Sequence, residues 1–176
     1  MTSSHLSKFL DEEIIRQRIT LMADELLPRL QPDPVVIGVM KGAFIFTADM
    51  VRALCRLGLD PEIDFITVSS YRLGLTSPGT IEILLDHTLD VRHRQVLLLD
   101  DIIDSGFTMN AVQKHLREKG VQELISVVLL NKPSRRQIPT PLDGHCFEVP
   151  DQFIVGYGLD HANRHRGLPH LAWIRS

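Results

Sequence analysis

The sequence has little of what would place it outside ordinary globular proteins. It contains two cysteines, one tryptophan and two tyrosines in 176 residues, and two cysteines are too few for a disulfide framework. No apolar run approaches the ~20 residues of a membrane-spanning helix, and no basic stretch followed by an apolar one begins the chain, as in a signal peptide. We therefore expect a cytoplasmic protein without a membrane partner, with buried thiols at Cys55 and Cys146.

The sequence also lacks an excess of either charge. It carries 19 Lys and Arg against 22 Asp and Glu, so that its formal net charge of −3 predicts no nucleic-acid partner. Apolar residues make up 44% of the chain, which excludes disordered and fibrous proteins. This length suits one domain with a sizeable core, and we predict a single domain over residues 1–176.

Helix and strand patterns alternate through most of the chain. Apolar residues recur every three or four positions from Ile15 to Leu26 and again after Gly42, and a third helix is expected over 108–119. Short apolar runs predict strands at 35–39, 63–69, 81–85, 96–99 and 124–130. This alternation indicates an α/β fold, with a central, mainly parallel sheet flanked by helices.

The last third of the sequence has a different character. Pro133, Pro139, Pro141 and Pro150 interrupt it, and one strand is predicted, over Phe153 to Tyr157. We interpret residues 35–131 as the core and expect a small hood built from the chain ends, mainly from residues 132–176.

Residues 97–108, LLLDDIIDSGFT, join an apolar run to three carboxylates and then to a turn of small residues. Ligands of open parallel sheets bind at the carboxyl ends of strands. The free N–H groups that open the next helix, with the hydroxyls of Ser105 and Thr108, suit a phosphate. A ribose 5-phosphate fits both parts, with its phosphate in the turn and its hydroxyls on Asp100 and Asp101, directly or through Mg²⁺.

Two other interpretations of this segment are considered. Acids and hydroxyl residues are common at solvated helix starts, where they have no ligand. The spacing from Asp100 to Asp104 also matches the DDxxD pattern that binds Mg²⁺-diphosphate in all-helical enzymes. That pattern requires a long helix, whereas the apolar run here predicts a strand.

The segment Val96 to Thr108 resembles the phosphoribosyl-pyrophosphate motif of type I phosphoribosyltransferases. Further segments, in the family's order, resemble hypoxanthine or hypoxanthine-guanine phosphoribosyltransferases: Met40-Lys41-Gly42, Ser69-Ser70-Tyr71, Leu130 to Arg136 and Phe153 to Asp160. The resemblance implies the type I phosphoribosyltransferase fold. It also implies a purine-salvage enzyme that transfers a 5-phosphoribosyl group from phosphoribosyl pyrophosphate to hypoxanthine, and to guanine, giving IMP or GMP and pyrophosphate.

The resemblance implies a role for each matched residue. Asp104 corresponds to the catalytic carboxylate, the proton acceptor near the purine imidazole nitrogen. The ribose 5-phosphate would be bound by Asp100, Asp101, Asp104, Ser105, Gly106, Phe107 and Thr108. Pyrophosphate would be bound by Lys41, Gly42, Ser70, Tyr71 and Arg166, with a cis peptide bond between Met40 and Lys41. The Mg²⁺ ligands would be Asp100, Asp101 and Asp160.

Purine recognition is assigned by the same resemblance to the last third of the chain. Lys132 would donate to the 6-oxo group, and Phe153 would stack on the ring. The backbone around Ile154 and Asp160 would read the opposite edge of the base. The segment 71–80 corresponds to a loop that closes during reaction, which would exclude water.

The remaining interpretations concern partners and metals. A phosphoribosyl-pyrophosphate-sensing regulator that binds nucleic acid on the same fold is the alternative to an enzyme. The resemblance implies a homodimer or homotetramer. A zinc site is suggested by the spacing of His161, His165 and His170. We instead expect these histidines to face solvent or to support residues of the site without binding a metal. The pair Arg135-Arg136 is expected in a solvated loop.

Overall fold

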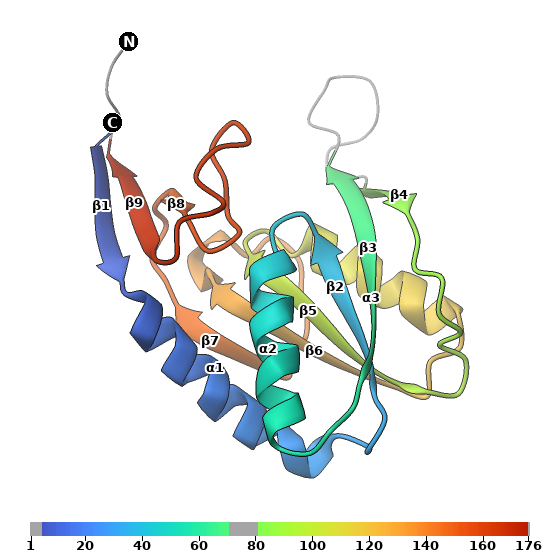
Figure 1. The fold of residues 1–176 in the computed structure, drawn as a ribbon. Coiled ribbons are helices and arrows are strands. Elements are labelled where there is room, and N and C mark those ends of the chain that lie inside the picture. The colour runs from blue at the N-terminus through green and yellow to red at the C-terminus, as the bar shows by residue number, and fades with distance from the viewer. Residues whose placement is uncertain (1–4, 71–80, 176) are drawn as a thin grey trace.

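A six-stranded sheet in the order β4-β3-β2-β5-β6-β7 organises the chain (Figure 1). The computed structural model describes residues 5–70 and 81–175. The strands are β2 (Val35–Met40), β3 (Glu62–Ser70), β4 (Ile81–Leu85), β5 (Gln95–Ile103), β6 (Glu123–Asn131) and β7 (Gly144–Glu148). Neighbouring strands pair in parallel, apart from the antiparallel pair β3 and β4. The predicted α/β fold with a mainly parallel sheet is confirmed.

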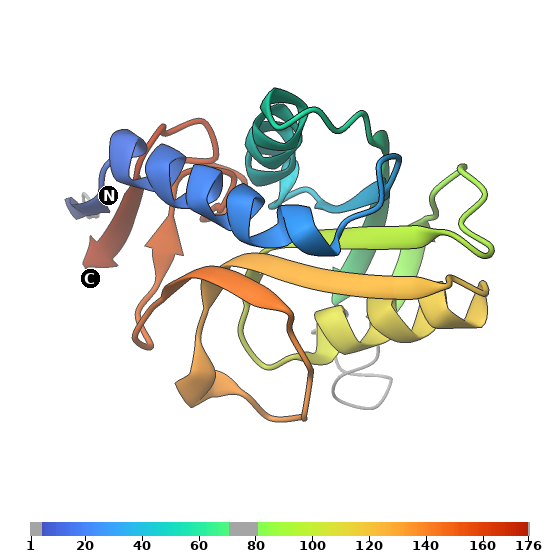
Figure 2. The same cartoon turned by 90° about the horizontal axis from the view of Figure 1, so that it is seen from below.

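Helices cover both faces of this sheet (Figure 2). The helices are α1 (Glu12–Leu26), α2 (Phe44–Arg56) and α3 (Phe107–Glu118), with short 3-10 turns η1 (Leu27–Arg29) and η2 (Pro133–Arg135). Alternate residues of β5 point to opposite faces. Leu97 and Leu99 pack with α1 and α2, whereas Val96 and Leu98 pack with α3. The continuous apolar run of β5 therefore serves two cores.

A second, three-stranded sheet joins the two ends of the chain (Figure 1). Its order is β1 (His5–Leu10), β9 (Leu171–Arg175) and β8 (Ile154–Val155), and both pairings are antiparallel. Phe9 stacks on Trp173 with 3.9 Å between ring centroids, which fastens β1 to β9. The proposed division into core and hood stays a prediction.

Several sequence predictions need correction. The strands β1, β7 and β9 were not predicted, and β8 is shorter than residues 153–157 because Tyr157 turns the chain with a φ of 47°. Cys146 is buried, as expected, and lies within β7. Cys55 is exposed on α2, so the expectation that it is buried was wrong.

The topology marks one place for a ligand. The crossover from β2 to β3 carries α2 on one face, and the crossover from β5 to β6 carries α3 on the other. The two crossovers diverge between β2 and β5, and ligands of open α/β sheets bind where this happens. None of the helices in the described ranges has the length and apolar character to cross a membrane.

Candidate active site at the carboxyl ends of β2 and β5

Two adjacent carboxylates lie where the ladder between β2 and β5 ends. The ladder between these strands ends at Gly38 and Leu99, so Asp100 is the first residue of β5 beyond it. β5 is longer than predicted because its pairing with β6 continues to Ile103, which places Asp100 and Asp101 inside the strand.

Burial dominates the electrostatics of this pair. Asp100 is buried, and its Oδ1 accepts a hydrogen bond from the N–H of Asp101 at 2.9 Å. Burial raises the pKa of both carboxyls, and the like charge of Asp101 raises the pKa of Asp100 further. The Arg166 guanidinium acts in the opposite direction on the pKa of Asp101. The ionised pair therefore requires a cationic or hydrogen-bonding ligand.

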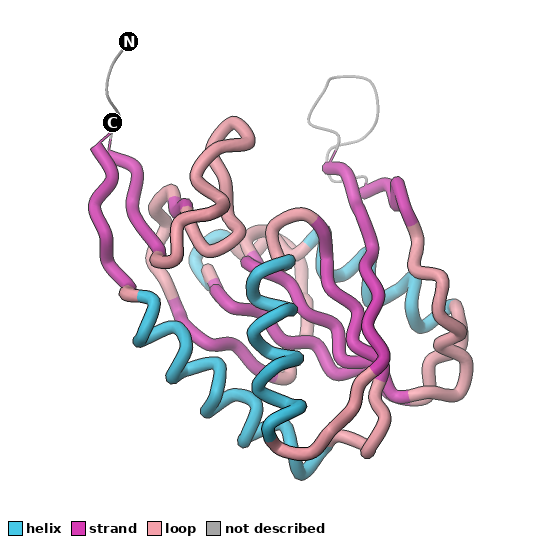
Figure 3. The backbone as a smooth tube through the Cα atoms, viewed as in Figure 1, coloured by secondary structure: helices cyan, strands magenta, loops and turns pink. Residues whose placement is uncertain are grey.

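The loop after β2 lies directly against Asp101. Its peptide bond between Met40 and Lys41 is cis, in agreement with the expectation from the resemblance. Gly42 lies against the carboxylate, since a Cβ at its position would lie 1.8 Å from Oδ2 of Asp101 and would force that side chain or the loop to shift. Gly158 approaches the same loop so closely that its Cβ would lie 2.0 Å from the carbonyl oxygen of Gly42. Three segments that are distant in sequence therefore meet at one end of the sheet (Figure 3).

Arg166 and Asp160 contact each other beside this junction. Nη2 of Arg166 lies 2.6 Å from Oδ1 of Asp160, and Nη1 donates to the carbonyl oxygen of Gly158 at 2.7 Å. The other oxygen of Asp160 accepts from the N–H of Asn163 at 2.7 Å. Arg166, which is predicted to bind pyrophosphate, therefore lies near Asp101 and pairs with Asp160, which is predicted to ligate a metal.

The turn from Ser105 to Thr108 opens α3 at the end of β5. Gly106 precedes the helix with a φ of 95°, a conformation that favours glycine, and it has no side chain to cap the first turn. Loop residues from beyond β6 support the turn. Thr140 donates its hydroxyl to the carbonyl oxygen of Gly106 at 3.3 Å, and the N–H of Gln137 donates to that of Ser105 at 3.0 Å. The N–H groups of this turn form a site suited to an anion.

Asp104 lies between the carboxylate pair and this turn. Its Oδ1 accepts from Nε of Arg135 at 3.2 Å, and its carbonyl oxygen accepts from Nε of Arg136 at 3.1 Å. Arg136 also donates to Oδ1 of Asn131 at 2.8 Å. Arg135 is exposed, as expected for a solvated loop, whereas Arg136 is partly buried. Sequence spacing carries no signal for these contacts, because they depend on how the loop after β6 folds back onto the end of β5.

The residues predicted for the purine have different environments. Lys132 is buried, at 7% exposure, and its N–H donates to the carbonyl oxygen of Ile103 at 3.0 Å. Phe153 is 54% exposed, and the edge of its ring meets His161 at 5.4 Å between centroids. Ile154 is buried in β8. Ser70 is the last residue of β3, and Tyr71, with the predicted closing loop 71–80, lies outside the described residues.

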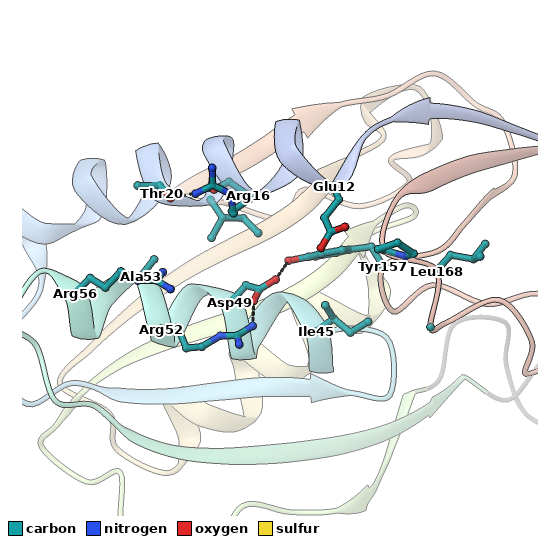
Figure 4. A pocket seen from close by; sticks show the side chains of 13 residues that line it. Glu12, Arg16, Thr20, Ile45, Asp49, Arg52, Ala53, Arg56, Tyr157 and Leu168 are labelled. Carbon is teal, nitrogen blue, oxygen red and sulfur yellow. Dashed lines mark hydrogen bonds and ion pairs between the residues drawn. The ribbon is translucent and has the colours of Figure 1, made fainter.

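Tyr157 anchors the segment that carries Gly158 and Asp160. Its hydroxyl donates to the carboxylate of Asp49 on α2, which also pairs with Arg52 (Figure 4). These side chains line a cavity of about 440 Å³ between α1 and α2, and the residues predicted to bind substrate do not line it. The sequence does not predict this anchor, because Asp49 and Tyr157 are far apart in the chain.

Comparison with known proteins decides the family. The family model described as "Phosphoribosyl transferase domain" matches residues 5–162. The chain belongs to the phosphoribosyltransferase family. It is 42% identical to a hypoxanthine-guanine phosphoribosyltransferase of Aquifex aeolicus, over 96% of this chain and 94% of the relative. It is 36% identical to a hypoxanthine phosphoribosyltransferase of Haemophilus influenzae, over 99% and 98%.

Solved structures agree with this assignment. The crystal structure of a hypoxanthine-guanine phosphoribosyltransferase from Bacillus anthracis superposes with a TM-score of 0.90 and 32% identity, and covers 98% of this chain and 100% of that one. The predicted type I phosphoribosyltransferase fold and enzyme class are confirmed. The relatives support purine salvage and give no support to a nucleic-acid-binding regulator. The roles of individual site residues in this phosphoribosyltransferase stay predictions.

Proposed function

We propose that this phosphoribosyltransferase transfers the 5-phosphoribosyl group from phosphoribosyl pyrophosphate to hypoxanthine and guanine, forming IMP and GMP. The observation that supports this substrate class is the hydrogen bond from the backbone N–H of Lys132 to the carbonyl oxygen of Ile103. It holds a buried lysine beside Ile103, the residue that precedes Asp104. Three groups therefore lie near the end of β5. They are Lys132, a donor for the purine base, the carboxylate of Asp104, and the turn from Ser105 to Thr108 that is suited to an anion.

The phosphate and ribose of the substrate have separate partners in this arrangement. The first-turn N–H groups of α3 and the hydroxyls of Ser105 and Thr108 would hold the 5-phosphate. The carboxylates of Asp100 and Asp101 would accept the ribose hydroxyls. Lys41, Gly42 and Arg166 would bind the pyrophosphate, with Ser70, at the end of β3, and Tyr71 contributing to its binding.

The donor set fits Mg²⁺ as the cofactor. Asp100 and Asp101 offer hard carboxylate oxygens, and Mg²⁺ prefers such ligands together with phosphate oxygens of a substrate. Burial disfavours the charged form of both acids, which a divalent cation would offset. Bound there with substrate, the ion would neutralise charge on the pyrophosphate. Asp160 would ligate a second ion after it leaves Arg166.

Asp104 would act as the general base. Displacement of pyrophosphate leaves positive charge on the ribose ring, and nearby carboxylates stabilise that charge most strongly where water is excluded. The proton that the purine loses has to be accepted by a group within hydrogen-bond reach. Asp104 is suited to this task because Arg135, its partner, is half exposed and can turn away when substrate binds.

Lys132 would select 6-oxopurines. Its ammonium can donate to a 6-oxo group, whereas adenine presents an amino donor at the same position. A buried donor left without an acceptor costs about 1–3 kcal/mol, and sites built on such hydrogen bonds reject the wrong base strongly. Phe153 would stack on the base while the backbone near Ile154 and Asp160 contacts its opposite edge.

The test is a competition among four bases. The protein is incubated with phosphoribosyl pyrophosphate, Mg²⁺ and hypoxanthine, guanine, xanthine or adenine, and the nucleotides are separated by chromatography. We expect IMP and GMP and no AMP. Lys132→Ala should lose most of this turnover, whereas Lys114→Ala, which changes an exposed lysine on α3, should not. Absence of nucleotide from every base, or equal use of adenine, would contradict the proposal.

The proposed assembly is a homodimer or homotetramer in the cytoplasm, with phosphoribosyl pyrophosphate and a 6-oxopurine as its small-molecule partners. Sedimentation velocity over a range of protein concentrations measures the assembly directly. A monomer at all concentrations would contradict it.

A further inference from the structure

A histidine and carboxylate cluster lies away from the proposed active site. Asp86 and His87 follow β4, and His115 lies in the last turn of α3. One ligand atom from each lies within 4.8 Å of those of the other two. Nε2 of His115 is 3.0 Å from both carboxylate oxygens of Asp86, and Nε2 of His87 is 3.6 Å from Oδ1. Around a tetrahedral ion with bonds of ~2.0 Å, ligand atoms lie roughly 3.3 Å apart.

His87 supplies an independent indication of a ligand. Its side chain is 3% exposed, and Nδ1 lies 2.9 Å from the carbonyl oxygen of Leu89. Because a carbonyl can only accept, Nδ1 carries a proton, and in the neutral imidazole Nε2 then presents its lone pair. Within residues 5–70 and 81–175, this buried Nε2 has no hydrogen-bond partner. Metal-binding histidines commonly have this pattern, in which one ring nitrogen donates to a carbonyl and the other faces the ion.

An ordinary ion-pair cluster explains only part of this arrangement. Nζ of Lys119 lies 2.8 Å from Oδ2 of Asp86 and can hold that carboxylate together with His115. This ion-pair cluster leaves the buried Nε2 of His87 without a hydrogen-bond partner, and buried polar atoms normally have one. The side chain of Lys119 is 36% exposed, so its ammonium can move into solvent when a cation occupies the cluster.

We propose that Asp86, His87 and His115 bind one divalent transition-metal ion, with Zn²⁺ as the representative. Two imidazole nitrogens and a carboxylate favour such an ion over Mg²⁺, which prefers oxygen ligands. This site is separate from the proposed Mg²⁺ site on β5. It joins the segment after β4 to α3, and His115 is eight residues beyond Phe107 in the anion-binding turn, or roughly 12 Å along the helix. The ion would therefore stabilise the helix that presents that turn.

The test uses the full, tag-free chain after removal of metals with a chelator. Zn²⁺ is titrated calorimetrically in the presence of excess Mg²⁺, which occupies oxygen-ligand sites, and thermal unfolding is followed with and without Zn²⁺. We expect one Zn²⁺ per chain and a higher midpoint of unfolding. Co²⁺ in place of Zn²⁺ should give a visible absorption band from nitrogen and oxygen ligands.

Matched variants locate the ion. His115→Gln and His87→Leu should each weaken Zn²⁺ binding by at least ~10-fold and remove the Co²⁺ band. Loss of a residue that only orients a metal ligand lowers metal affinity by roughly 10–100-fold, and loss of the ligand itself should lower it at least as much. His145→Gln, which changes a histidine on β7, should bind Zn²⁺ like the wild type. Unchanged Zn²⁺ affinity in His115→Gln, whose side chain is 24% exposed, or absence of Zn²⁺ binding by the wild type, would overturn the proposal. Because His115→Gln alone decides the matter, a folding defect in His87→Leu would not obscure the result.

Discussion

Gly42 and Asp101 are so close that a Cβ on residue 42 would lie 1.8 Å from Oδ2 of the carboxylate. Any larger residue at position 42 would therefore displace the Asp101 carboxylate or the loop after β2. The contact joins the proposed pyrophosphate loop to the proposed ribose carboxylates, so that the position of one depends on the other.

We expect Gly42→Ala to lower kcat/KM for phosphoribosyl pyrophosphate by about 10²-fold, since displacement of catalytic groups by about 1 Å has effects of this size. Steady-state kinetics measure the effect. Gly167→Ala is the control, because a Cβ there meets no atom within 4 Å. Equal kinetics for the two variants would show that the close contact has no functional role.

Asp104 provides the second prediction. Asp104→Asn should retain the fold and lower kcat by ~10²–10⁴-fold, the usual contribution of a general base. Asp151→Asn is a matched control because Asp151, which is half exposed, also faces Arg135, at 3.5 Å. Single-turnover measurements with saturating substrates separate the chemical step from product release. Unchanged turnover in Asp104→Asn would remove its proposed role.

The third prediction concerns acid stability and Asp64 on β3. Burial acts to raise the pKa of this carboxyl, but hydrogen bonds from Thr88, Phe65 and Leu89 outweigh it, so the pKa lies below its usual 3.8. A carboxyl whose folded pKa is lowered stabilises the protein above its unfolded pKa and loses that contribution as pH falls through the folded pKa.

We therefore expect the free energy of unfolding to decline below about pH 4. Asp64→Asn should be less stable at pH 7 by about 1–3 kcal/mol, because its amide nitrogen cannot accept these bonds, and its stability should fall less steeply in acid. Urea unfolding between pH 7 and pH 3 measures both. Asp24→Asn, at an exposed position on α1, should behave like the wild type, and a parallel decline of Asp64→Asn and wild type would contradict the prediction.

The fourth prediction distinguishes the two thiols. Cys146 is buried in β7, and burial raises its pKa to about 12, whereas Cys55 is exposed on α2. Since the thiolate is the reactive form, the native protein should consume one equivalent of a thiol reagent at pH 8 and two after unfolding. Cys55→Ser should abolish the native reaction and Cys146→Ser should preserve it. Two equivalents in the native state would show that β7 opens readily.

Local sequence patterns were sufficient to predict most of the helices and strands and to recognise the family. The strand over residues 81–85 was predicted with its bounds, and the helical stripe from Ile15 to Leu26 is buried as expected. The segment from Val96 to Thr108 carries its chemistry in consecutive residues, so it can be recognised before folding is considered. These features depend on side-chain periodicity and on neighbours in the chain.

Other features exist only in the folded chain. β1 and β9 are short strands whose partners lie at opposite ends of the sequence, and no local pattern predicts their pairing. The contacts of Arg135 with Asp104, and of His115 with Asp86, depend on loops and helices that pack across the sheet. Residue type and spacing decided which chemistry was available, whereas the packing of distant segments decided which of these groups became neighbours.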